Sequence, residues 1–141
     1  MNVGRILTGG LLAGLVMNIG EFLLNGVIMG EKWDAAMAEM EMAPMGGGTI
    51  GVLVAVTFLI GIALVWLYAA IRPRFGAGPK TAIIAGFFAW LLLSVMPFVW
   101  NQLVPIWPAN LMMTGLVWSF FEIPIVTVVG AWIYKEKAPL M

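Results

Sequence analysis

Four long apolar runs constrain the fold of this chain more than any other feature. They extend over residues 5–29, 50–71, 81–101 and 110–134. A hydrocarbon core about 30 Å thick is crossed by about 20 residues of α-helix. Because 62% of the 141 residues are apolar and only 10% are charged, a globule of this size could not hide its apolar side chains from water. We therefore expect an all-α fold, an integral membrane four-helix bundle that forms one domain over residues 1–141.

Positively charged residues are distributed unevenly between the two sides of this arrangement. Six of them lie on one side and only Lys32 lies on the other. Lys and Arg near the ends of membrane spans favour the cytoplasm. The pattern predicts a multi-pass protein of the bacterial inner membrane with both termini cytoplasmic. The six residues are Arg5, Arg72, Arg74, Lys80, Lys135 and Lys137.

The first loop, residues 30–49, contains a short helical pattern. Trp33, Ala36, Met37 and Met40 recur at the spacing of one helix face, and the acidic residues of this stretch lie off that face. This pattern predicts a short amphipathic helix in the first extracytoplasmic loop, either on the membrane surface or against the bundle. A partly ordered loop is the alternative.

Small and polar residues form one row in the first run and another in the fourth. At such spacings small residues let two helices approach closely, and polar side chains can hydrogen-bond across the contact. We expect the first and fourth spans to pack along these rows, with Asn18 opposite Glu122 and Glu21 opposite Ser119. The first row is Gly10, Gly14, Asn18, Glu21 and Asn25, and the second is Gly115, Ser119, Glu122, Val126 and Gly130.

Glu21 and Glu122 place two carboxyl groups within the hydrocarbon, with no Lys or Arg at their depth. A lone carboxylate there costs several kcal/mol, so it must pair, meet water or take up a proton. We expect Glu122, the deeper of the two, to hold a proton at neutral pH. One interpretation is a proton-exchanging or cation-binding site that includes Asn18, Asn25 and Ser119. The other is a set of neutral polar groups that fix the helix register.

The chain contains no Cys and no His, which removes disulfides, thiol chemistry and imidazole ligands or bases. Its four clustered loop methionines, in residues 37–45, are more typical of flexible apolar packing than of a copper site. Its formal net charge of zero argues against a nucleic-acid partner. We therefore expect no catalytic residues, no cofactor, no metal and no enzymatic activity.

These observations favour a non-catalytic function, that of an accessory or stabilising subunit of a larger membrane assembly. Its partners would be the lipid bilayer and other membrane subunits, or further copies of the chain. The alternative is a small proton-coupled transporter of a cation or amphiphile that uses the two intramembrane carboxyls.

Overall fold

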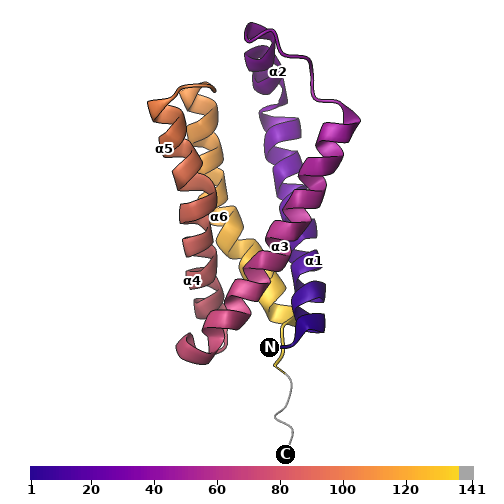
Figure 1. The fold of residues 1–141 in the computed structure, drawn as a ribbon, viewed down its shortest axis with the longest axis vertical. Helices are drawn as coiled ribbons and strands as arrows, with labels where there is room; N and C mark the ends of the chain where they lie inside the picture. The colour runs from indigo at the N-terminus through magenta and orange to yellow at the C-terminus, as the bar shows by residue number, and fades with distance from the viewer. Residues whose placement is uncertain (137–141) are drawn as a thin grey trace, which may run out of the picture.

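A computed structural model describes residues 1–136 of the chain and confirms the all-α membrane architecture (Figure 1). Within these residues four helices are long and apolar enough to cross a membrane: Val3–Ile28, Gly47–Phe75, Pro79–Leu103 and Ala109–Ile133. Lys137, counted above among the cationic residues, lies outside the described residues. The protein is therefore a multi-pass membrane protein whose outer surface faces lipid.

The first span is α1 (Val3–Glu21), which continues directly as the π-helix η1 (Phe22–Ile28). After Met29 the chain forms α2 (Gly30–Glu39), the predicted amphipathic helix. Ala36 and Met37 of α2 are buried, and Ala36 forms a small apolar cluster with Leu24, Met29 and Leu111. The helix therefore packs against the bundle.

The remaining spans are α3 (Gly47–Phe75), a third span in three parts, and α6 (Ala109–Ile133). The third span consists of α4 (Pro79–Trp90), the π-helix η2 (Leu91–Val95) and α5 (Met96–Leu103). Pro97 has no N–H group to donate, and it lies directly after the widened turns of η2, where the helix departs from regular α-helical hydrogen bonding.

The helix α3 is longer at both ends than its apolar run predicts. The predicted loop residues 72–75 continue the helix, with Pro73 inside it. Arg72 and Arg74 lie in the last turn, where positive charge interacts favourably with the helix dipole. The helix ends at Gly76, whose φ of 87° suits a residue without a side chain.

The helices come together at the end of the bundle that holds the N-terminus and spread apart toward α2 and α5 (Figure 1). We call these the terminal end and the α2 end. Helix α1 packs on α3 and α6, and α4 packs on α6 and α3. The main core lies in the terminal half and is rich in alanine, so the backbones approach closely. Its members include Ala13, Ala69, Ala82, Ala85, Ala89 and Ala131.

Polar contacts join the chain segments at the terminal end. The Tyr134 hydroxyl accepts a hydrogen bond from the Asn2 N–H (3.2 Å) and donates one to Glu136 Oε2 (2.7 Å). Arg72 Nη1 lies 3.5 Å from the same carboxylate oxygen. Tyr134 also packs edge-on against Tyr68, whose hydroxyl accepts from the Gly78 N–H. The ends of α1, α3 and α6 are thereby held together.

Candidate functional site

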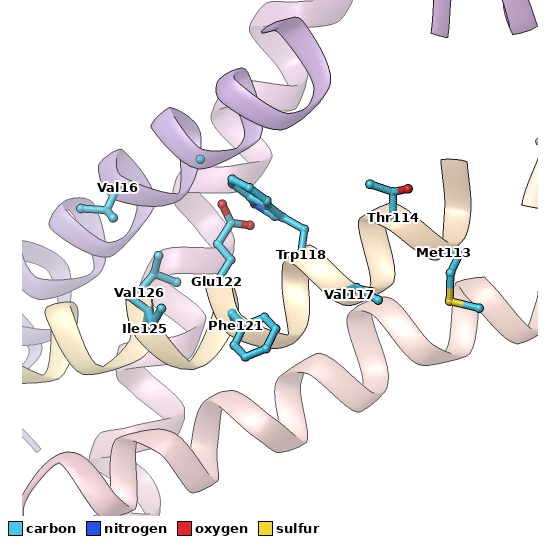
Figure 2. A pocket seen from close by; sticks show the side chains of 10 residues that line it. Val16, Met113, Thr114, Val117, Trp118, Phe121, Glu122, Ile125 and Val126 are labelled. Carbon is cyan, nitrogen blue, oxygen red and sulfur yellow. The ribbon is translucent and has the colours of Figure 1, made fainter. Parts of the chain in front are cut away.

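A cavity of about 680 Å³ lies between α1 and α6, on the α2 side of the main core (Figure 2). Its volume falls within the range of about 300–1,000 Å³ that is usual for small-molecule sites. The wall is mainly apolar. It is formed by Val16, Gly20, Met113, Thr114, Val117, Trp118, Phe121, Glu122, Ile125 and Val126.

Glu122 is the acidic residue of this wall. It lies 13 residues after Ala109 and 11 before Ile133, about 20 Å and about 17 Å from the two ends of α6. Its side chain points across the cavity toward α1 (Figure 2), and only 8% of the residue is exposed. Both carboxyl oxygens lack a hydrogen-bond partner among the described residues. The site therefore contains a carboxyl group near mid-membrane that no described residue engages in a hydrogen bond of regular geometry.

Gly20 and Trp118 shape the space around this carboxyl. A methyl group built on Gly20 of α1 would overlap Glu122 Oε1, so the missing side chain makes room for the carboxyl. The Trp118 indole lies beside Glu122 (Figure 2), and its buried Nε1 also has no partner among the described residues. An unpaired acceptor and an unpaired donor thus share one cavity wall.

Glu21 is the titratable neighbour of Glu122, near enough for their charges to interact. The other helices in contact with α6 bring no titratable group to this level. On α3 and α4 such groups are Tyr68, Arg72, Arg74 and Lys80, which belong to the terminal end. The ion pairs of the described residues also lie there. Neither membrane carboxyl therefore has a cationic partner within residues 1–136.

A chain of hydrogen bonds connects Glu21 with the α2 end. Asn25 donates through Nδ2 to Glu21 Oε2 (2.6 Å), and its Oδ1 accepts from the indole Nε1 of Trp33 in α2 (3.0 Å). Trp33 packs edge-on against Trp107, with ring centroids 5.3 Å apart. The position of the loop helix is thus linked to the carboxyl of Glu21.

Asn101 holds Trp107 in place for this contact. Its Oδ1 accepts from the N–H groups of Ile106 (3.2 Å) and Trp107 (2.9 Å), and its Nδ2 donates to the Trp107 carbonyl (2.9 Å). Its buried side chain thereby organises the loop between α5 and α6.

The two polar pairs predicted from depth are wrong. Asn18 faces α3, where its Nδ2 donates to the carbonyls of Gly14 (2.9 Å) and Val54 (3.4 Å). Ser119 donates to the Leu116 carbonyl of its own helix (3.1 Å). Equal depth did not bring these side chains together because α1 presents a different face to α6.

The helix-packing prediction is correct for the α1–α6 pair but wrong about the face of α1. Gly10 and Gly14 pack against α3, where the backbone of Gly61 meets them. On α6, Gly130 does meet α1, whereas a methyl group at Gly115 would have no atom within 4 Å. Gly115 therefore makes no close helix contact within the described residues.

The residues of α1 that contact α6 form a neighbouring row that the sequence analysis missed. Gly9 lies against the backbone of Gly130, Ala13 lies near Gly130, and Gly20 lies against Glu122. Small residues at positions 9, 13 and 20 share a helix face, so the signal was present in the sequence. Gly61 determines which of the two rows on α1 contacts α6. Because Gly61 has no side chain, α3 packs closely on the row of Gly10 and Gly14 and leaves the other row to α6.

This geometry allows one kind of chemistry above others. A buried carboxyl without a cationic partner avoids a lone charge by holding a proton, or by pairing with a cation that enters the cavity. Comparison of the chain with protein family models, curated proteins and solved structures gave no match.

Proposed function

We propose that this protein is a small proton-linked carrier of a monovalent cation, with Glu122 as the exchanging group. The observation that carries the proposal is the unpaired Glu122 carboxyl, buried in the wall of a cavity near the middle of the membrane. Intramembrane ionisable groups commonly mark the paths of ions and protons. Glu21, held by Asn25, is a neighbouring carboxyl that does not line the cavity.

The exchange keeps the charge of the cavity nearly constant. In the empty state the Glu122 carboxyl holds its proton, because a lone carboxylate is costly at this depth. When a cation enters, the O–H bond breaks and the proton leaves to water, so that carboxylate and cation form a neutral pair. When the cation leaves, a proton returns to the same oxygen.

Flux of protons driven by a cation gradient tests the proposal. The protein is reconstituted in liposomes that contain a pH-sensitive dye, and a gradient of potassium, tetramethylammonium or decyltrimethylammonium is imposed. None of these cations has a proton to lose, so none can diffuse across the bilayer in a neutral form and change the pH by itself. We expect at least one gradient to drive proton movement in the wild type and not in Glu122→Gln, while Asn110→Gln, at the exposed start of α6, transports normally. Equal flux in wild type and Glu122→Gln would refute the carrier function.

Within this proposal the terminal end faces the cytoplasm and the membrane is a bacterial inner membrane. Arg5, Arg72, Arg74, Lys80 and Lys135 all belong to that end, which favours this orientation. Because the chain has no Cys, single-cysteine variants test it cleanly. In intact cells a membrane-impermeant thiol reagent should label Ala43→Cys and leave Lys80→Cys unlabelled. The reverse pattern would overturn the orientation.

A second candidate function, that of an accessory subunit, is supported by the exposed beginning of α3. Residues 47–56 are all exposed and include Gly48, Gly51 and Ala55, which are spaced so that another helix could approach closely. Native mass spectrometry of protein extracted from its own membrane tests this role. A heteromeric complex that dissociates in Gly51→Phe but persists in Gly115→Phe would support it. A monomer in all three samples would contradict it.

A further inference from the structure

We propose that the cation bound beside Glu122 is a single-tailed amphiphile with an ammonium head, which enters the cavity sideways from the lipid. This inference rests on the proposed binding of a cation at Glu122 and names the class of ligand. It adds two things to that function: the tail, and the route by which the ligand arrives.

The opening of the cavity indicates the route. Val117, Phe121 and Ile125 line it and are spaced four residues apart along α6, on one helix face. They are also 53%, 60% and 57% exposed. Residues that line a cavity and are half exposed lie at its mouth, and in a membrane span that mouth opens toward hydrocarbon. A ligand dissolved in the bilayer can reach Glu122 without passing through water.

The apolar wall of the cavity indicates that the ligand carries an alkyl tail. Val16, Val117, Phe121 and Ile125 offer only carbon to the space, and Thr114 uses its hydroxyl to donate to the Asn110 carbonyl (2.8 Å). An inorganic ion that gave up its water here would find almost no oxygen ligands to replace it, although K⁺ needs several. An alkyl tail would cover this apolar surface at a gain of about 25 cal/mol per Å².

The polar groups of the wall indicate that the head group of the ligand carries a single positive charge. Glu122 supplies one unpaired carboxyl that is nine-tenths buried and aimed into the cavity. Glu21 is not part of the wall and is hydrogen-bonded to Asn25, so a single positive charge matches the site. Trp118 adds an aromatic surface next to the carboxyl (Figure 2), and aromatic faces attract ammonium groups. A second charge on the ligand would remain unpaired.

Photoaffinity labelling in lipid nanodiscs tests the inference. The probes share one twelve-carbon tail with a diazirine at its middle, and carry a trimethylammonium, a hydroxyl or a carboxylate head. We expect the ammonium probe to label the 113–126 segment of α6 at least tenfold more than the other two. Labelling should fall about tenfold in Glu122→Gln and in Val117→Trp, which fills the mouth. Val99→Trp, on an exposed site of α5 outside the cavity, should label as the wild type does.

Equal labelling of this segment by the ammonium and hydroxyl probes would overturn the inference, and so would labelling by the ammonium probe that Glu122→Gln leaves unchanged. This failure differs from failure of the carrier function. Proton flux driven by tetramethylammonium, without ammonium-specific labelling, would leave the carrier standing and refute the amphiphile. Glu122-dependent labelling without any proton flux would refute the carrier and leave the amphiphile site standing.

Discussion

Gly20 of α1 lies directly against the carboxyl of Glu122 on α6. This carboxyl occupies the space in which any other residue at position 20 would place its β-carbon. The carboxyl can extend toward α1 only because this position has no side chain. The packing of the two helices is thereby linked to the chemistry of the cavity, because a side chain at position 20 would displace the Glu122 carboxyl.

Replacement of Gly20 by alanine should displace the Glu122 carboxyl at little cost in stability. The new methyl group would overlap Oε1, which is the far end of a flexible side chain and can move aside. Gly115→Ala is the matched control, because a methyl group there meets nothing within 4 Å. Unfolding in mixed micelles should place the stability of Gly20→Ala within about 1 kcal/mol of that of Gly115→Ala. A loss of about 3 kcal/mol in Gly20→Ala alone would show that the carboxyl is held in place and cannot move aside.

The contact between α1 and α3 should be more sensitive to a methyl group, at Gly61, than the contact at Gly20. A methyl group there would meet the backbone of Gly10 and Gly14, and backbone atoms cannot move aside as a flexible side chain can. Gly61→Ala should cost about 3 kcal/mol, while Gly51→Ala on the same helix, which meets no neighbour, should not destabilise the protein. The same micelle titration measures both, and a neutral Gly61→Ala would place α3 on another face of α1.

Asn25 should control the mobility of α2. Asn25→Ala removes one hydrogen bond to Glu21 and one from Trp33, each contributing about 1 kcal/mol. Amide hydrogen exchange in residues 30–39 should accelerate roughly tenfold as α2 separates from the bundle. Asn18→Ala, whose bonds go to Gly14 and Val54, should leave that exchange unchanged. Equal acceleration in both variants would show that α2 responds to general loosening.

The contacts of Glu136 at the terminal end should make stability depend on acidity. The Tyr134 hydroxyl, the terminal amine and Arg72 hold the pKa of the Glu136 carboxyl below its ordinary value of 4.5. A depressed folded-state pKa stabilises the protein above the unfolded value, and this contribution is lost as the pH falls through the folded value. Wild type should therefore exceed Glu136→Gln in stability by a constant amount above about pH 5.5.

Below about pH 4 this difference should shrink, because protonation removes the charge that the mutation also removes. Thermal unfolding of both proteins from pH 7 to pH 3 measures it. A difference that persists unchanged at pH 3 would show that the Glu136 charge does not hold the ends of α1, α3 and α6 together.

Much of the fold could be predicted from hydropathy because lipid imposes one simple requirement on a spanning helix. The four spans and the amphipathic α2 follow from it. The π-helices of Phe22–Ile28 and Leu91–Val95 could not be predicted, because they depend on local hydrogen bonding and not on the periodicity of apolar residues. The extension of α3 through Pro73 likewise depends on its last turn and Gly76.

The candidate site was predicted only in part. Glu122 and Glu21 stand out as charges within apolar runs, and the link from Glu21 to Asn25 follows from their spacing. The partners across the helices do not follow, because α1 carries two rows of small residues about a quarter-turn apart. The backbone contact of Gly61 with Gly10 and Gly14 leaves the row of Gly9, Ala13 and Gly20 to α6.

Proton release on cation binding tests the central claim most directly. Decyltrimethylammonium, which has no proton of its own to lose, is added to the purified protein in weakly buffered detergent solution, and the pH change is compared with the amount bound. The account predicts about one proton released for each ligand bound by the wild type, and none for Glu122→Gln. Binding by the wild type without proton release, or the same release from Glu122→Gln, would contradict it.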